Sequence, residues 1–237
     1  MICIIPARAG SKRIYEKNLK VLDGVPIIGR TIRRAQGSGL FSEIFVSTES
    51  ENISRISEDF GAQVLERPKE LADDYSSTLD VMKHALGKVT PEKSILVCCL
   101  YPITPLLNFS RISEAIRKIE TGLYDFVFPA LPLHSQAFRA FECENEGRIK
   151  QFDSKNLKMR TQDLAGMYVD AGQFYLARTE TWLNSESIIS SQSCAVFLKP
   201  WEVLDVDTPQ DWEVMESMYH LRNSSYIASS REGENND

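Results

Sequence analysis

Short apolar segments alternate with amphipathic segments from the first residue to about position 130. Four apolar runs are continuous or nearly so, which is typical of strands buried on both faces of a sheet. We therefore expect these segments to be strands of one buried sheet. The runs are Ile2–Ile5, Ile44–Ser47, Ile95–Cys99 and Phe126–Phe128.

Helical spacing of apolar residues fills the intervals between these runs. Ile53, Ile56 and Phe60 repeat at i, i+3 and i+7, and the pattern stops at Gly61, a residue that commonly ends helices. Alternating strands and helices predict an α/β fold with a mainly parallel sheet and helices on both faces. Such sheets bind ligands at the carboxyl ends of their strands. Similar spacing predicts further helices over about 26–37, 79–87 and 112–119.

This alternation breaks between 129 and 167, where Pro, His, Glu, Asn and Gly mix with aromatic residues in no regular period. We interpret this segment as an insertion that covers a sheet edge or contacts a second subunit. Strand-like runs resume at Ala171–Ala177 and Cys194–Leu198. Thr208 as N-cap followed by Pro209 predicts a last helix. We expect one domain over 1–221 and a disordered tail over 222–237, because apolar content falls after Leu221.

The composition is that of an ordinary globular protein and excludes fibrous, disulfide-dense and disordered classes. The chain has 237 residues, 43% of them hydrophobic and 25% charged, with a net charge of −6. The longest apolar run, 95–107, contains two prolines and is too short to cross a membrane. The apolar start covers only five residues, without a basic segment before it, so we expect no signal peptide and a cytoplasmic location.

The five cysteines favour free thiols over disulfides or a metal site. Cys3, Cys98 and Cys99 lie inside apolar runs, where a thiol behaves as a small hydrophobic group. Because neighbouring residues of a strand face opposite sides, Cys98 and Cys99 are not placed to bind one metal together. We therefore expect buried, reduced thiols and set aside a zinc site.

A basic segment follows the first predicted strand and is the strongest functional signal in the chain. Residues 8–20 contain five basic side chains and one acidic side chain, a local charge of +4, so the rest of the chain carries −10. Small residues such as Gly10 let backbone N–H groups approach phosphate oxygens, while Arg and Lys supply charge-assisted bonds. The segment matches neither the Walker A nor the G-x-G-x-x-G pattern. The alternative is a solvated loop with incidental charge.

A pair of carboxylates, Asp205 and Asp207, precedes the last predicted helix. We place both at the end of a strand, where their spacing of two residues puts them on one side and lets them bind a hard cation such as Mg²⁺ together. Asp207 could instead cap the helix and Asp205 be a surface charge. A phosphate-binding loop in the same chain favours the metal site, because Mg²⁺ neutralises phosphate charge during nucleotidyl transfer.

Several segments together resemble the acylneuraminate cytidylyltransferase family over roughly residues 2–219. They are IIPARAGSKRIYEKNLK, VSTES, ELADD with the following serines, and LDVDTPQDW. CCLYPITPL, DFVFPA, RTQDL and YVDAGQFY resemble the subgroup that acts on pseudaminic acid. The resemblance implies a Rossmann-like domain of the nucleotide-diphospho-sugar transferase type with an inserted dimerisation element, and therefore a homodimer.

The same resemblance implies roles for individual residues. Arg8 and Lys17 match the triphosphate-binding cations of the family, and Asp205 and Asp207 match its metal-binding aspartates. Arg160 matches an arginine that approaches the sugar carboxylate, a task suited to a planar guanidinium, although it could be a surface residue. The nucleotide site would further include Ala7, Gly10, Ser11, Lys12 and Asn18, with Ser76 and Thr78 near the cytosine ring.

Two departures from the family pattern bear on the substrate. Tyr15 stands where the loop commonly has Pro, so this loop is less restrained. Tyr101 replaces the Gln typical of enzymes for sialic acid, which favours pseudaminic acid. Gln173 and His134 are then candidates for contacts with the sugar substituents, although an isolated His such as His134 is equally explained by a structural or solvent role.

We therefore expect a Mg²⁺-dependent enzyme that transfers CMP from CTP to a nine-carbon α-keto acid sugar and releases pyrophosphate. The first alternative is the same reaction on sialic, legionaminic or ketodeoxyoctulosonic acid. The second is a nucleotide-sugar binding protein that keeps the fold without turnover. A nucleic-acid partner is disfavoured, because the net charge of −6 repels a phosphate backbone.

Overall fold

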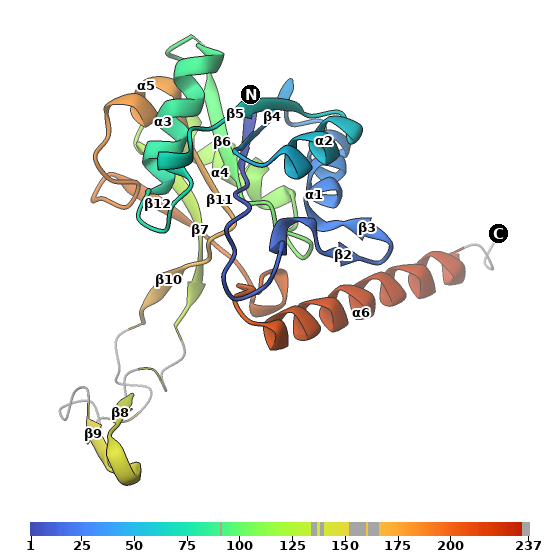
Figure 1. Ribbon diagram of the computed structural model, residues 1–237, viewed down its shortest axis with the longest axis vertical. Helices are drawn as coiled ribbons and strands as arrows, with labels where there is room; N and C mark the ends of the chain where they lie inside the picture. The colour runs from blue at the N-terminus through green and yellow to red at the C-terminus, as the bar shows by residue number, and fades with distance from the viewer. Residues whose placement is uncertain (91, 134–136, 138–139, 152–159, 161–165, 234–237) are drawn as a thin grey trace.

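A mixed sheet of eight strands forms the centre of the described part of the chain (Figure 1). This computed structural model describes residues 1–237 except 91, 134–136, 138–139, 152–159, 161–165 and 234–237. The strand order is β10-β7-β11-β6-β1-β4-β5, and β12 also pairs with β7. The strands are β1 (Ile2–Pro6), β4 (Glu43–Thr48), β5 (Gln63–Glu66), β6 (Leu96–Leu100), β7 (Phe126–Pro132), β10 (Tyr168–Asp170), β11 (Phe174–Arg178) and β12 (Ser193–Phe197).

The pairing confirms the prediction of a mainly parallel sheet. β1 pairs in parallel with both β4 and β6, and β5 and β12 also join parallel neighbours. Only β10 and β11 run against their neighbours in this sheet, as far as the structure describes it. The carboxyl ends of β1, β4, β5 and β6 therefore meet at one edge, where the sequence predicts the ligand.

Six helices cover the sheet and its edge in the described chain (Figure 1). Polar capping residues explain where several of these helices begin. Ser50 accepts a hydrogen bond from the Ile53 amide, and Ser77 and Asp80 form a reciprocal capping box. Thr208 and Asp211 cap the last helix in the same way, as the sequence predicts. The helices are α1 (Ile27–Gly37), α2 (Glu51–Asp59), α3 (Thr78–Val89), α4 (Ser110–Glu120), α5 (Thr179–Asn184) and α6 (Pro209–Gly233).

Smaller elements lie at the edges of this core. β2 (Val21–Leu22) and β3 (Val25–Pro26) form a short hairpin after the basic segment, and β8 (Phe141–Cys143) pairs with β9 (Ile149–Gln151). Single 3₁₀ turns connect other elements. They are η1 (Lys17–Leu19), η2 (Lys69–Leu71), η4 (Asn145–Gly147) and η7 (Pro200–Glu202).

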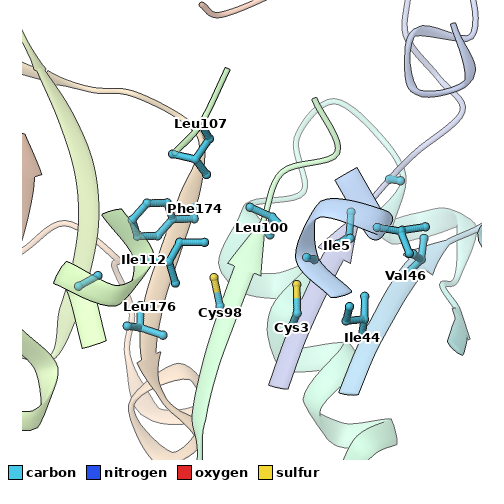
Figure 2. Close-up of a cluster of buried hydrophobic side chains, with 14 of the residues drawn as sticks. Cys3, Ile5, Ile44, Val46, Cys98, Leu100, Leu107, Ile112, Phe174 and Leu176 are labelled. Carbon is cyan, nitrogen blue, oxygen red and sulfur yellow. The ribbon is translucent and has the colours of Figure 1, made fainter. Parts of the chain in front are cut away.

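The two faces of the sheet bury separate clusters of apolar side chains. Cys3 and Cys98 point into the cluster beneath α1, α2 and α4, where Figure 2 shows Cys98 near Ile112 and Cys3 near Ile44. Cys99 lies in the opposite cluster with α3 and α5. The three thiols are buried, as expected, and burial raises their pKa above the ordinary value. Each fully buried aliphatic side chain contributes roughly 1.5–3 kcal/mol to such a core.

The inserted segment is shorter than the sequence indicates. β7 continues through Pro132, so residues 129–132 belong to the sheet rather than to an insertion. This stretch was not predicted as strand because prolines flank its apolar residues, and proline usually indicates the end of a strand. Beyond it, the β8–β9 hairpin lies away from the sheet (Figure 1).

The expectation of a disordered tail from 222 is wrong as far as Gly233, because α6 runs without interruption from Pro209 to Gly233. Residues 222–232 contain no Gly or Pro, so nothing in their backbone stops a helix that has already started. No described helix combines the length and the apolar character needed to cross a bilayer.

Candidate active site

A cavity of about 350 Å³ opens at the carboxyl ends of the parallel strands. Its wall includes Arg8 after β1, Arg67 after β5, and Tyr101 after β6. Gln173 enters from the start of the antiparallel strand β11, which lies at the same edge. The cavity therefore lies at the edge of the sheet where the sequence predicts the ligand. The wall is completed by Pro6, Lys17, Asn18, Leu71, Asp73, Asp74, Ser76, Thr78, Val81, Pro102, Ile103, Gly172, Leu204, Asp205 and Val206.

The basic segment wraps one side of this cavity and is held there by acidic partners. Arg8 lies 2.9 Å from one Asp74 carboxylate oxygen, and Lys12 lies 2.6 Å from the other. Arg8 also donates to the Asp73 carbonyl. Hydrogen bonding and charge from Lys12, followed by Arg8, lower the pKa of Asp74. The positive loop predicted from sequence is therefore matched by a carboxylate from the ELADD segment, which the sequence analysis did not name as a site residue.

The backbone of this loop is less open than the sequence suggests. The Ala9 amide donates to Glu49 at 2.7 Å, and the Ser11 amide donates to the Ala9 carbonyl at 2.8 Å. These two N–H groups are engaged within the protein, so the charged side chains are the main groups offered to an anion. Asn18 supports the loop by donating to the Arg8 carbonyl at 2.9 Å.

Arg67 is a cavity residue that the sequence analysis missed. Its side chain is 3% exposed and lies 2.8 Å from Glu49, while its Nε is buried without a hydrogen-bond partner. Its position directly after a parallel strand would have indicated a site residue, but strand β5, which ends one residue before Arg67, was not predicted. A guanidinium has five N–H donors, and the Glu49 contact engages only part of them, so Arg67 brings a fixed positive charge to the cavity wall.

Ser76 and Thr78, which the family resemblance places near the cytosine ring, lie at the start of α3 and line the cavity. Ser76 donates to the Asp73 carboxylate at 2.7 Å, and this bond is the main cause of the lowered pKa of Asp73. The Thr78 hydroxyl is 2.7 Å from the Tyr101 hydroxyl, so it connects the nucleotide side of the cavity to the predicted sugar side. Ser77, between them, caps the helix instead.

Tyr101 and Gln173 are brought together on the other side of the cavity. Their segments are joined by the Tyr101 amide, which donates to the Gln173 carbonyl at 2.9 Å. Gln173 is 4% exposed, and its side-chain amide donates to the carbonyls of Ala171 and Gly172. Burial raises the pKa of Tyr101, so its hydroxyl remains a neutral hydrogen-bonding group.

Asp205 and Asp207 do not lie on a strand, which corrects the sequence analysis. Residues 203–207 follow η7 as irregular chain, and the buried side chains Val203 and Val206 are three residues apart. The period-2 argument therefore does not apply to this segment. Asp205 lines the cavity, and burial, with the nearby charge of Asp207, raises its pKa.

Asp207 faces the cations of the basic segment. Its carboxylate is 3.0 Å from Arg13 and 3.6 Å from Lys17. Its backbone amide donates to Asp211, the residue that caps α6, so the side chain itself is free of the capping role considered from sequence. Among the described residues, no group of three or more His, Cys, Asp or Glu side chains could hold a metal ion. A pair of carboxylates still fits Mg²⁺, which is usually bound by one or two carboxylates together with substrate phosphates.

The remaining predicted residues lie outside the cavity wall. Ala7 is buried beneath the loop, whereas Gly10 and Lys12 are exposed on it, with Ser11 half-buried. Arg160 is exposed and is not among the described residues that line the cavity, so its role at the sugar carboxylate stays a prediction. His134 lies outside the described residues.

These features define an α/β protein with a cation-lined ligand cavity at the carboxyl ends of its parallel strands. The sequence profile of the cytidylyltransferase family matches residues 2–226, so the chain belongs to that family. It is 36% identical to pseudaminic acid cytidylyltransferase of Campylobacter jejuni, over 94% of this chain and 98% of that protein. It is 34% identical to N-acylneuraminate cytidylyltransferase A of Danio rerio, over 90% of this chain and 49% of that protein.

A solved structure agrees with the observed architecture. It is a CMP:2-keto-3-deoxy-manno-octonic acid synthetase in complex with CTP, with a TM-score of 0.70. The similarity covers 93% of this chain and 98% of that one, at 16% sequence identity. The likeness shows that the two chains share a fold, and it confirms the predicted sugar-nucleotide transferase type of α/β domain.

Proposed function

We propose that this cytidylyltransferase transfers CMP from CTP to pseudaminic acid and releases pyrophosphate. The observation that carries the proposal is one cavity that has Arg8 and Lys17 in its wall together with Tyr101 and Gln173. A site that combines cations with neutral hydrogen-bonding groups suits a triphosphate beside a polyhydroxylated sugar acid. The similarity to the Campylobacter jejuni protein supports the choice of sugar.

In the proposed reaction, the anomeric hydroxyl of the sugar attacks the α-phosphorus of CTP. An O–P bond forms, the bond between the α-phosphorus and the pyrophosphate oxygen breaks, and the hydroxyl proton is released. The C–O bond at the anomeric carbon stays intact, so its configuration is retained. Arg8 and Lys17 hold the leaving pyrophosphate by charge-assisted hydrogen bonds, and no covalent enzyme intermediate is required.

Mg²⁺ is part of the proposal. Asp205 and Asp207 would hold it, because their carboxylates are adjacent and one of them lines the cavity. When bound, the ion supplies charge stabilisation at the phosphates. Asp207 already faces Arg13 and Lys17, so its carboxylate helps to position Lys17, one of the two cations that hold the leaving group.

We further propose a homodimer that forms through β10 and β12. Tyr168 and Phe197, which belong to these strands, stack with ring centroids 4.5 Å apart, although each is more than half exposed. Exposed aromatic pairs beside other apolar side chains are typical of protein interfaces. The reduced, buried thiols suit a cytoplasmic location, which we propose for the enzyme.

Pyrophosphate release tests the function with CTP, Mg²⁺ and a panel of pseudaminic, legionaminic, sialic and ketodeoxyoctulosonic acids. UTP, ATP and GTP serve as nucleotide controls. Release that depends on CTP and is fastest with pseudaminic acid is expected. Preference for sialic acid, the substrate class favoured by the Danio rerio relative, would keep the reaction and correct the sugar. No release with any acid would refute the assignment.

A further inference from the structure

Four arginines surround a second cavity, of about 290 Å³, between α1 and α6. Arg30, Arg33 and Arg34 come from consecutive turns of α1, and Arg222 comes from α6. None of these residues was singled out from sequence, and the proposed reaction uses none of them. The cavity is completed by Val25, Pro105, Tyr219 and Asn223.

The arginines are fixed mainly by backbone carbonyls rather than by carboxylates. Arg34 donates to the carbonyls of Thr104 and Leu107, and Arg222 donates to the carbonyl of Leu106. Carbonyl oxygens orient a guanidinium without removing its charge. Because a guanidinium carries five N–H donors in a planar fork, each of these side chains keeps donors for a further acceptor.

Arg30 is held in the same manner, whereas Arg33 lies against an aromatic ring. Arg30 donates to the Leu22 carbonyl at 2.6 Å and to the Tyr219 hydroxyl, yet its Nε is buried without a hydrogen-bond partner. Arg33 lies over the ring of Phe60, with its guanidinium carbon 4.5 Å from the ring centroid. Stacking on an aromatic ring fixes the plane of the guanidinium and leaves its edge accessible.

The positive charge of this cluster is largely uncompensated. Within the described residues, the one ion pair that any of these arginines forms joins Arg30 to Asp23, at 3.9 Å. Burial and the neighbouring charge of Arg222 lower the pKa of Arg34 to about 10. Four cations around one cavity repel one another, so an anion bound among them would relieve an unfavourable interaction.

We propose that the arginine cavity binds a small phosphate-type anion. Planar guanidinium groups recognise phosphate oxygens through paired hydrogen bonds, and several of them around one cavity match a multiply charged oxyanion. Val25, Pro105 and Tyr219 bound the space and limit the ligand to a small species. This inference stands independently of the proposed function, because it uses no residue of the candidate active site.

The site adjoins the active-site cavity through one loop. Pro102 and Ile103 line the first cavity, and Pro105 of the same loop lines the second. An anion in the arginine cavity would contact the guanidiniums that hold Thr104, Leu106 and Leu107 in place.

Pyrophosphate and inorganic phosphate are the probes, titrated by calorimetry into the full chain. Arg8→Ala is used as the background, so that binding at the candidate triphosphate site is weakened. In this background, Arg33→Gln with Arg222→Gln removes two exposed guanidiniums from the cavity. The matched control is Arg55→Gln with Arg117→Gln, which makes the same charge change on the exposed faces of α2 and α4.

The control is expected to bind pyrophosphate, and the cavity variant is expected to bind it at least tenfold more weakly, because charge-assisted hydrogen bonds are lost. Arg33→Lys with Arg222→Lys, which keeps the charge but not the fork, should fall between them. Thermal unfolding establishes that each variant is folded. Equal pyrophosphate affinity in the cavity variant and the control, or no binding by the control, would overturn the proposal.

Discussion

The two cavities of this protein both gather cations, but they balance the charge in opposite ways. In the active-site cavity, Arg8 and Lys17 face the carboxylates Asp74 and Asp207. In the arginine cavity, Arg34 and Arg222 are held by backbone carbonyls. A carboxylate partner neutralises a cation and must yield when a phosphate takes its place, whereas a carbonyl positions the cation and leaves its charge intact. The first arrangement suits a site of turnover, and the second suits a site of simple binding.

The largest effect is expected from Asp207→Ala, which removes the carboxylate that faces Arg13 and Lys17. We expect the rate of pyrophosphate release to fall by roughly two orders of magnitude or more, because preorganised charge at the phosphates is lost. Asp125→Ala, in the turn before β7, is the matched control and should retain the rate. Steady-state kinetics and thermal unfolding of both variants check the prediction. Full activity of Asp207→Ala would remove this residue from the site.

Arg8→Ala should raise the KM for CTP by roughly tenfold to a hundredfold, because charge-assisted hydrogen bonds to the triphosphate are lost. The KM for the sugar should change little, because the proposed function assigns Arg8, a residue of the cavity wall, to the triphosphate. Arg117→Ala, on the exposed surface of α4, is the control. An unchanged KM for CTP in Arg8→Ala would argue against a triphosphate at this position.

Low pH should weaken cations that are paired with carboxylates, because a carboxylate loses its charge in acid, whereas a backbone carbonyl does not titrate. Glu202 is buried against Arg111, with an oxygen 2.8 Å from the guanidinium. Burial alone would raise the pKa of Glu202, but the hydrogen bonds from Arg111 and the Lys199 amide outweigh it and lower the pKa. A lowered pKa stabilises the fold above the ordinary value of 4.5, and this contribution is lost as pH falls through the folded value.

Glu202→Gln should therefore cost about 2 kcal/mol of unfolding free energy at neutral pH and flatten the loss of stability below pH 4.5. Denaturant unfolding at several pH values measures both effects. Glu186→Gln is the matched control, because Glu186 is exposed and forms no ion pair within the described residues. If the free energy of unfolding depends on pH in the same way in wild type and in Glu202→Gln, the Glu202–Arg111 pair does not contribute to the pH dependence of stability.

The smallest effect is expected from Tyr101→Phe, which removes the hydroxyl beside Thr78. We expect the KM for the sugar to rise by up to about tenfold, since one hydrogen bond is lost. The KM for CTP should be nearly unchanged. Tyr124→Phe, before β7, makes the same chemical change away from the cavity. A larger effect on CTP than on the sugar would place Tyr101 on the nucleotide side instead.

Much of the fold could be predicted from sequence, because buried parallel strands and amphipathic helices leave clear periodicity. Strands such as β1 and β6 are nearly continuous apolar runs. The shorter elements were missed for a physical reason. β5, with the sequence QVLE, has too few apolar residues to stand out, although pairing with β4 fixes it in the sheet.

The site was predicted only in part. The basic segment was found because several cations follow a buried strand directly, and the family resemblance then singled out Arg8 and Lys17 within it. Asp74 and Arg67 were not found, since their role depends on the loops that bring them across to Lys12 and Glu49. The arginine cavity was invisible for the same reason, because Arg222 comes from α6 and lies 189 positions beyond Arg33. Contacts between distant segments have no local signature in a sequence.

Phosphorus NMR of the complete reaction tests the central claim most directly. With CTP, Mg²⁺ and pseudaminic acid, the account predicts that the CTP resonances are replaced by those of pyrophosphate and of one CMP phosphodiester, in equal amounts. CDP together with a sugar phosphomonoester, or with orthophosphate if water is the nucleophile, would show attack at the terminal phosphorus instead of the α-phosphorus. That result, or CTP left unchanged, would contradict the account.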